Sequence, residues 1–248
     1  MTLKAVLIDF HSTIIKDAAL QQDLFDELLI RENLRPDLKR DRELCLGQPD
    51  RTCIQALLEQ RGRVVEPAYL DQLAQQKALA YCQRLQSLAK LPIYVDIPDF
   101  FFKLRAEQIK IAIVTSELRP AVEQVLKDSH LDQYLDVLIS GEQIQQPRPD
   151  PDGHLQAIAA LNQQYPDLQC EPQTCLAVES SYLGIEAARR AGLSVVAIAN
   201  LRPLHMLQRR ANWVVDSTRE LELDRIQAML NKPYEQATLD LEPESSTT

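Results

Sequence analysis

The sequence lacks an excess of positive charge and lacks any apolar run long enough to cross a membrane. Its 27 Lys and Arg residues face 36 Asp and Glu residues, which gives a formal net charge of −9. Nucleic acid and anionic membranes repel such a chain, so we expect neither as its main partner. No apolar stretch approaches the ~20 residues that span a bilayer, and the first residues lack the basic-then-apolar pattern of a signal peptide. We therefore expect a cytoplasmic protein.

The sequence also lacks paired cysteines. Its five cysteines are an odd number without Cys-x-x-Cys spacing. This usage favours free thiols in a reducing compartment over a disulfide framework. It also argues against a zinc site, because no close pair of Cys or His accompanies them.

A short apolar run near the start of the chain ends in a carboxylate. Residues 5–8 read Ala-Val-Leu-Ile and lead into Asp9, as in a strand that is buried on both faces of a parallel sheet. Further strands are predicted at 109–114, 137–139, 174–178, 194–199 and 213–215, with helical patterns between them. This alternation predicts an α/β protein with a doubly wound parallel sheet and right-handed crossovers.

Residues 15–90 show helical periodicity only. Helices are predicted over 17–31, 51–61 and 67–85, with a polar stretch at 33–43 that contains Pro36. The predicted organisation is a core of residues 1–14 and 91–231, an inserted helical cap of residues 15–90, and a flexible acidic tail of residues 232–248. The Phe100–Phe102 run and Trp213 are predicted as core residues.

Polar residues follow four of the predicted strands, at Asp9 with His11, at Thr115, at Arg148 and at Glu179. Ligands of open α/β sheets bind at the carboxyl ends of the strands, so we expect these side chains in one crevice. A carboxylate, a hydroxyl, a cation and a second carboxylate suit phosphoryl transfer through an aspartyl-phosphate. In that chemistry one Asp attacks, the hydroxyl and the cation hold the anionic oxygens, and the second acid helps to hold Mg²⁺.

The order and spacing of these segments resemble the haloacid dehalogenase-like (HAD) hydrolase superfamily, in its branch of beta-phosphoglucomutase and CbbY-type phosphatases. The similar segments are LIDFHSTI, AIVTS, RPDPDGHL and LAVESSYLGIEAARRAG for the four family motifs, and GQPDR for the substrate-selecting cap loop. The resemblance covers residues 3 to 230 and implies a doubly wound core, an inserted helical cap and an active site between them. It implies a small phosphorylated substrate and these site residues: Asp9, His11, Thr115 and Arg148 for catalysis, Ser116 and Arg51 for substrate binding, and Asp9, the His11 carbonyl and Glu179 for Mg²⁺.

The chain departs from the family pattern at four positions. His11 stands where the family has the Asp that protonates the leaving oxygen; an imidazole can act as an acid, but its cationic form would repel Mg²⁺. Arg148 replaces a Lys, which keeps the charge and changes its shape. Ser180 replaces an Asp that would normally ligate Mg²⁺, which weakens the implied metal site. Ser12 replaces a common Gly.

Each site residue also has a plainer interpretation. Asp9 can cap the following turn, Glu179 can be a solvated acid, and Arg148 can be the structural ion-pair partner of either. Thr115 can be retained without a role, His11 can fill its position for packing or for another ligand, and Arg51 can be a surface residue. His130, His154 and His205 are assigned no role.

Three functional hypotheses follow. The first is a Mg²⁺-dependent phosphohydrolase or phosphomutase-like enzyme. The second, from a different class, is a catalytically silent HAD-like protein that acts as a binding or assembly module for a protein partner. The third is a metal-independent haloacid dehalogenase.

Overall fold

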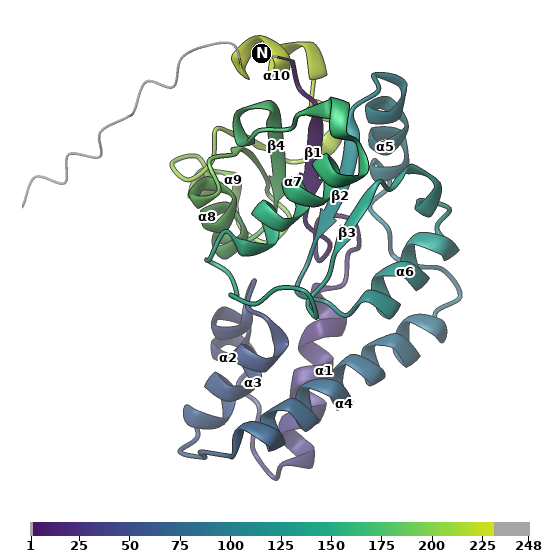
Figure 1. Ribbon diagram of the computed structural model, residues 1–248. Helices are drawn as coiled ribbons and strands as arrows, with labels where there is room; N and C mark the ends of the chain where they lie inside the picture. Colours follow the sequence, from purple (N-terminus) through teal and green to yellow (C-terminus); the bar gives the residue numbers. More distant parts are fainter. Residues whose placement is uncertain (1, 231–248) are drawn as a thin grey trace, which may run out of the picture.

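In the computed structural model of this protein, which describes residues 2–230, an open six-stranded parallel sheet lies at the centre (Figure 1). The strand order is β3-β2-β1-β4-β5-β6. The expected α/β fold with a parallel sheet is thereby confirmed, whereas the predicted flexible tail of residues 232–248 lies outside the described residues. The strands are β1 (Ala5–Ile8), β2 (Lys110–Val114), β3 (Val137–Ile139), β4 (Cys175–Glu179), β5 (Ser194–Ile198) and β6 (Trp213–Val215).

Alternate strand residues supply two apolar layers, one on each face of the sheet. Val6 and Ile8 of β1 belong to the layer that includes side chains of α5, α6 and α10. Ala5 and Leu7 belong to the layer that includes side chains of α7, α8 and α9. Both faces are therefore covered, which explains why the strands read as continuous apolar runs. These helices are α5 (Ile97–Ala106), α6 (Arg119–Asp128), α7 (Asp152–Gln164), α8 (Tyr182–Arg190), α9 (Leu204–Leu207) and α10 (Leu223–Leu230), with short 3-10 turns η1 (Asp132–Tyr134), η2 (Pro166–Leu168), η3 (Pro172–Thr174) and η4 (Thr218–Glu220).

The register of β1 fixes where the polar strand ends meet. Ile8 pairs with Ile113 of β2 and with Val178 of β4, so Asp9 and Glu179 extend to the same edge of the sheet. The strand order reverses direction between β1 and β4. Such a switch point is where open α/β sheets bind their ligands.

Four helices between β1 and α5 pack against one another below the sheet edge in Figure 1, and we call them the α1–α4 bundle. Their apolar cluster includes Phe25, Leu57 and Leu70. The bundle consists of α1 (Ala18–Arg31), α2 (Leu38–Cys45), α3 (Asp50–Glu59) and α4 (Pro67–Gln86).

Helix α2 was not predicted, because its residues are almost all polar. Its start does carry a local signal: Asp37, directly after Pro36, accepts a hydrogen bond from the backbone N–H of Arg40 at 3.2 Å. This is the usual geometry of an N-cap residue. Capping, rather than apolar periodicity, therefore marks this helix.

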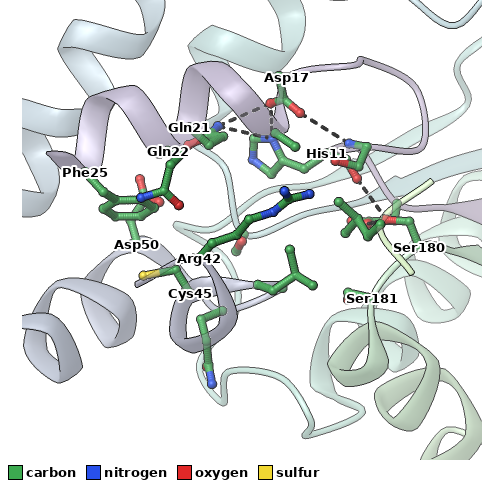
Figure 2. A pocket seen from close by; sticks show the side chains of 18 of the residues that line it. His11, Asp17, Gln21, Gln22, Phe25, Arg42, Cys45, Asp50, Ser180 and Ser181 are labelled. Carbon is green, nitrogen blue, oxygen red and sulfur yellow. Dashed lines mark hydrogen bonds and ion pairs between the residues drawn. The ribbon is translucent and has the colours of Figure 1, made fainter. Parts of the chain in front are cut away.

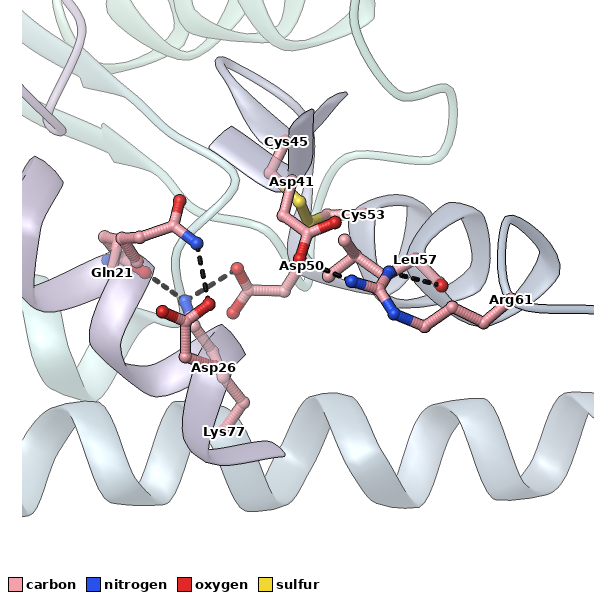
Figure 3. Close-up of a disulfide and its surroundings, with 10 residues drawn as sticks. Gln21, Asp26, Asp41, Cys45, Asp50, Cys53, Leu57, Arg61 and Lys77 are labelled. Carbon is pink, nitrogen blue, oxygen red and sulfur yellow. Dashed lines mark hydrogen bonds and ion pairs between the residues drawn. A yellow bond between two sulfur atoms is a disulfide. The ribbon is translucent and has the colours of Figure 1, made fainter. Parts of the chain in front are cut away.

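The prediction of free thiols is wrong for two of the five cysteines. Cys45 at the end of α2 and Cys53 in α3 form a disulfide, with Cα atoms 5.0 Å apart (Figure 3). The turn between the helices, where Gly47 has φ 77°, brings together two residues that are eight positions apart. Cys82, Cys170 and Cys175 are free thiols, as expected.

The prediction of a buried Phe100–Phe102 run is wrong at its last position. Phe100 and Phe101 are buried, but the side chain of Phe102 is 62% exposed, because three successive residues of a helix cannot share one face. Trp213 is half-buried and packs against the apolar layer of α5 and α6. Over residues 2–230, no helix combines the length and the apolarity needed to span a bilayer.

Candidate active site

A cleft lies between the carboxyl edge of the sheet and the α1–α4 bundle, with about 720 Å³ of empty space. Figure 2 shows its walls, with Phe25 and Asp50 of the bundle on one side and Ser180 and Ser181 on the other. The residues that line it include Asp9, His11, Ser116, Arg148 and Ser180 from the sheet, and Gln21, Gln22, Arg42, Gln48 and Asp50 from the bundle.

Asp9 lies at the end of β1 and pairs with Arg148. The Nη2 atom of Arg148 donates to Oδ1 of Asp9 at 3.0 Å and to the carbonyl oxygen of Val114 at 2.9 Å. The side chain of Arg148 is 8% exposed, so this is a buried ion pair. Burial raises the pKa of the Asp9 carboxyl, and the neighbouring Arg148 charge opposes that rise.

Glu179 lies beneath this pair and is fully buried. Its Oε1 accepts a hydrogen bond from Nε2 of His154 at 3.0 Å and lies 3.5 Å from Nη2 of Arg148. Its Oε2 has no hydrogen-bond partner among the described residues. It lies against Gly184, where a Cβ atom would come within 1.9 Å of it. The carboxylate thus fits only because position 184 has no side chain.

Ser180 occupies the place of the family's second metal acid. Its hydroxyl lies 3.1 Å from the carbonyl oxygen of His11 and 3.5 Å from Oδ2 of Asp9. One hydroxyl proton serves one acceptor at a time, and the shorter contact is to His11. Ser180 therefore joins the first and fourth motifs through a hydrogen bond.

His11 lies between two carboxylates. Its Nδ1 is 2.6 Å from Oδ2 of Asp17, and its Nε2 is 3.4 Å from Oε2 of Glu117. Burial lowers the pKa of the imidazole, but Asp17 and Glu117 outweigh this effect and raise the pKa of His11 to about 10. His11 is therefore an imidazolium at neutral pH.

Asp17 is held by residues of the bundle. The hydroxyl of Tyr81 donates to its Oδ2 at 2.8 Å, and the side-chain amide of Gln21 donates to the same oxygen at 3.3 Å. Nearby, the buried Lys77 donates to Oδ1 of Asp50 at 2.7 Å and also to Gln21 (Figure 3). The cleft wall on the bundle side is thus a network of buried charges with paired partners.

Ser12 supplies the bend after Phe10 that lets the chain enter the bundle. Its φ of 55° lies in the left-handed region, where glycine is favoured. Its backbone N–H donates to the carbonyl oxygen of Ile15 at 2.8 Å. The glycine common in the family suits this conformation better than serine does.

The other predicted site residues divide into those that reach the cleft and those that do not. Ser116 lines the cleft. The hydroxyl of Thr115 instead accepts the backbone N–H of Glu117 at 3.1 Å, and Thr115 is fully buried. Arg51 lies outside the cleft, where its Nε donates to Asp71 at 2.6 Å and its side chain is 46% exposed. Arg42 lines the cleft from the bundle.

Several residues of this site were missed in the sequence, namely Asp17, Glu117 and His154 near the strand ends and Gln22, Arg42 and Gln48 on the bundle side of the cleft. Glu117 carried the signal used for the others, since it follows β2 by three residues. Asp17 and His154 carried none, because only the packing of α1 and α7 against the sheet edge brings them to His11 and Glu179.

The residues that the resemblance implies for Mg²⁺ do not fit that ion. The His11 carbonyl accepts the Ser180 hydroxyl, and the carboxylates of Asp9 and Glu179 share the charge of Arg148. Mg²⁺ requires a near-octahedral set of oxygens that usually includes one or two available carboxylates. In the part of the chain that the structure describes, no three His, Cys, Asp or Glu side chains are grouped so as to hold a metal ion.

The chain belongs to the haloacid dehalogenase-like hydrolases, whose family profile matches residues 6–198. It is 29% identical over 149 residues to the validoxylamine A 7'-phosphate phosphatase of Streptomyces hygroscopicus subsp. limoneus, over 55% of this chain and 65% of that protein. It is 23% identical to protein CbbY of Rhodobacter capsulatus, over 79% of this chain and 85% of that protein. The matches span 65% and 49% of the length of the first two curated relatives.

The fold is similar to that of solved structures. The crystal structure of beta-phosphoglucomutase from Clostridium difficile has a TM-score of 0.79 and 21% sequence identity, and the match covers 93% of this chain and 98% of that one. At this identity the likeness establishes the fold. The family profile assigns the chain to the haloacid dehalogenase-like hydrolases, and the similarity to beta-phosphoglucomutase adds the fold alone.

Proposed function

We propose that this protein is a phosphohydrolase or phosphomutase-like enzyme for a small phosphorylated metabolite, with the α1–α4 bundle as the cap of its cleft. The observation that carries the proposal is the environment of Asp9. This carboxylate lines the cleft and its Oδ1 is held by Arg148, whereas the hydrogen bonding of its Oδ2 within residues 2–230 is limited to the 3.5 Å contact with Ser180. One oxygen is therefore oriented by a cation while the other is available as a nucleophile.

In the proposed reaction, Oδ2 of Asp9 attacks phosphorus and the bond from phosphorus to the ester oxygen breaks. The electron pair of that bond stays on the leaving oxygen, which takes up a proton. Water then attacks the phosphorus of the aspartyl-phosphate, which releases phosphate and restores the Asp9 carboxylate. Arg148 and the Ser116 hydroxyl hold the phosphoryl oxygens as negative charge develops on them.

His11 is the proposed proton donor. Its Nε2 is 3.4 Å from Glu117, whereas its Nδ1 is bound to Asp17 at 2.6 Å, so the proton on Nε2 is the less tightly held. A pKa of about 10 keeps this proton in place at neutral pH, so the donor form is present, but it makes His11 a weaker acid than a group whose pKa lies near the operating pH. A nearby imidazolium also favours an anionic substrate.

The wall on the bundle side supports a polar, anionic substrate. Arg42 brings a positive charge, and Gln22 and Gln48 bring amide donors and acceptors. The relative from Streptomyces hygroscopicus subsp. limoneus is named for hydrolysis of a phosphate ester, which agrees with this class of substrate.

Hydrolysis of a generic aryl phosphate tests the proposal. We expect turnover by the wild-type protein and a loss of at least ~10³-fold in Asp9→Asn, because the amide is no nucleophile. Asp23→Asn, the same change at an exposed position of α1, should retain wild-type turnover. Equal rates in wild type and Asp9→Asn would exclude attack by Asp9.

A second candidate is the catalytically silent binding module. It is favoured by the pairing of both ring nitrogens of His11 with carboxylates and by Ser180 in place of an acid. For such a module we expect binding of a ligand or a protein partner without turnover. We also expect Asp9→Asn to leave the behaviour of the protein in cells unchanged. Release of halide from a 2-haloacid would instead indicate the dehalogenase reaction.

A further inference from the structure

The guanidinium group of Arg148 lies between the two carboxylates that the family resemblance assigns to a metal ion. Its Nη2 is 3.0 Å from Oδ1 of Asp9 and 3.5 Å from Oε1 of Glu179. These two carboxylate side chains are at most 5% exposed, and that of Arg148 is 8% exposed. A guanidinium stays charged even when buried, so this cation is permanent.

The remaining oxygen that a metal ion would need is already engaged. The carbonyl of His11 accepts a hydrogen bond from Ser180 at 3.1 Å. Glu179 also contacts Nε2 of His154 at 3.0 Å. Each would-be metal ligand therefore has at least one partner within the protein, although Oε2 of Glu179 has none among the described residues.

Arg148 also retains donors for a ligand. Within the described residues its hydrogen bonds are made by Nη2, to Asp9 and to Val114, which leaves Nη1 and Nε free. Arg148 lines the cleft, and the fork of a guanidinium matches the oxygens of a phosphoryl group. One side chain can thus pair with the carboxylates and also hold the anion.

We propose that Arg148, at the position of the family's Lys, is also the resident cation between the two carboxylates, and that the cleft holds a phosphoryl group without a divalent metal ion. A divalent cation beside Asp9 would be repelled by the guanidinium and would find no third carboxylate at position 180. The phosphoryl part of this inference rests on the proposed function. The part that concerns the cation rests on the ion-pair geometry alone.

Titration of the wild-type protein with Mg²⁺ tests the cation directly. We expect no heat of binding by calorimetry and a change in Tm below about 1 °C at about 10 mM Mg²⁺, because a ligand that binds the native state raises Tm. Sub-millimolar binding that disappears in Asp9→Asn would overturn the proposal.

The variant Arg148→Gln/Ser180→Asp exchanges the cation for the missing acid. It should gain Mg²⁺ binding, seen as a rise in Tm of about 5 °C or more at the same concentration. Ser180→Asp keeps the guanidinium and should bind Mg²⁺ at least about tenfold more weakly than the double variant. Arg105→Gln, at a half-exposed Arg paired with Asp136, controls for the loss of an arginine. A folded double variant that does not bind Mg²⁺ would refute the role of Arg148. If the double variant does not fold, the titration of the wild-type protein with Mg²⁺ tests that role.

Inorganic phosphate provides the second readout. We expect it to raise the Tm of the wild-type protein equally in EDTA and in Mg²⁺, and not to raise that of Arg148→Gln. A rise that requires Mg²⁺ would overturn the proposal. No rise under either condition, with no Mg²⁺ binding, would reject the proposed phosphoryl ligand and leave the assignment of the cation intact.

Discussion

At the scale of single residues, His11 determines how the charges of the cleft balance. Two carboxylates with side chains at most 2% exposed, Asp17 and Glu117, flank its ring. Without the imidazolium, Asp17 would keep only uncharged hydrogen-bond donors and Glu117 only the charge of Lys77, and removal of one member of a buried ion pair costs about 3 kcal/mol. We therefore expect His11→Asn to lower the free energy of unfolding by about this amount, measured by urea denaturation at pH 6. His130→Asn, at an exposed residue with φ 57° that asparagine tolerates, should change it little.

The same ion pair predicts a dependence of stability on pH. The pKa of His11 is raised to about 10 in the folded protein, above its usual value near 6.5 in an unfolded chain. A raised pKa stabilises the fold fully below about pH 6.5, and this contribution is lost as the pH rises through about 10. The difference in the free energy of unfolding between wild type and His11→Asn should therefore become smaller from pH 6 to pH 10. A difference that stays constant would contradict the charged state of His11.

Helix propensity alone predicts that Gly184→Ala stabilises the protein, whereas the contacts around Gly184 predict that it destabilises it. Alanine in a helix interior is normally about 1 kcal/mol better than glycine. At this position the new Cβ would lie 1.9 Å from Oε2 and 2.6 Å from Cδ of Glu179. Glu179 would have to leave Arg148 and His154, and loss of charged hydrogen bonds costs about 2 kcal/mol. Gly184→Ala should therefore destabilise the protein in urea denaturation.

The matched control is Gly153→Ala in α7. Its Cβ would meet two apolar side chains, Cγ1 of the stiff, buried Val114 at 2.9 Å and the terminal Cδ1 of Ile144 at 3.0 Å, and it would displace no charged group. The loss should be smaller than for Gly184→Ala. The reverse order would mean that Glu179 is not held as described.

At the scale of elements, the disulfide constrains the loop that borders the cleft. Cys45 and Cys53 tie the end of α2 to α3 across the turn that contains Gly47 and Gln48, both of which line the cleft. A cross-link over eight residues is worth about 2.5 kcal/mol on the chain-entropy model. Cys45→Ser should lower the free energy of unfolding by about this amount. Addition of dithiothreitol should do the same to the wild type but not to the variant.

Cys82→Ser is the control for this experiment, because Cys82 is a free, half-buried thiol of α4. It should leave the response to dithiothreitol intact. A wild type that is insensitive to the reductant would contradict the role of the disulfide.

The elements differ in how far local sequence determines them. The strands were predictable because burial on both faces imposes apolar runs, and α1, α3 and α4 because one face of each is apolar. Helix α2 has no such face, and α9 is too short for a periodic pattern. The disulfide depends on a turn geometry that cysteine spacing does not reveal.

The candidate site follows the same division. Asp9, Arg148 and Glu179 were predictable as neighbours, since the carboxyl ends of parallel strands and the loops after them share one edge. The pairing of His11 with Asp17 and Glu117 was not, because it depends on the path from β1 into α1. Arg51 was assigned from the position of its loop, and the side chain that reaches the cleft from that region is Arg42, one helix earlier.

At the scale of the whole molecule, the bundle and the sheet share part of one apolar core. Tyr81 and Leu85 of α4, with Leu24 of α1, belong to the same cluster as Val6 and Ile8 of β1. The Tyr81 hydroxyl also binds Asp17 at the cleft. Shared burial of this kind couples the unfolding of two parts of a chain, so we expect one cooperative transition rather than two.

The variant Leu57→Ala tests this coupling from the side of the bundle. Leu57 is fully buried in the cluster that α1, α3 and α4 form, and its truncation should cost about 3 kcal/mol. The single tryptophan, Trp213 in β6, reports on the far end of the sheet. We expect the urea midpoint of Trp213 fluorescence to fall as far as that of far-ultraviolet circular dichroism. Leu38→Ala, at a leucine of α2 that is 66% exposed, should shift neither. An unchanged fluorescence midpoint beside an earlier loss of helix would show that the bundle unfolds alone, and a cleft built from both parts would then exist only while the bundle is folded onto the sheet.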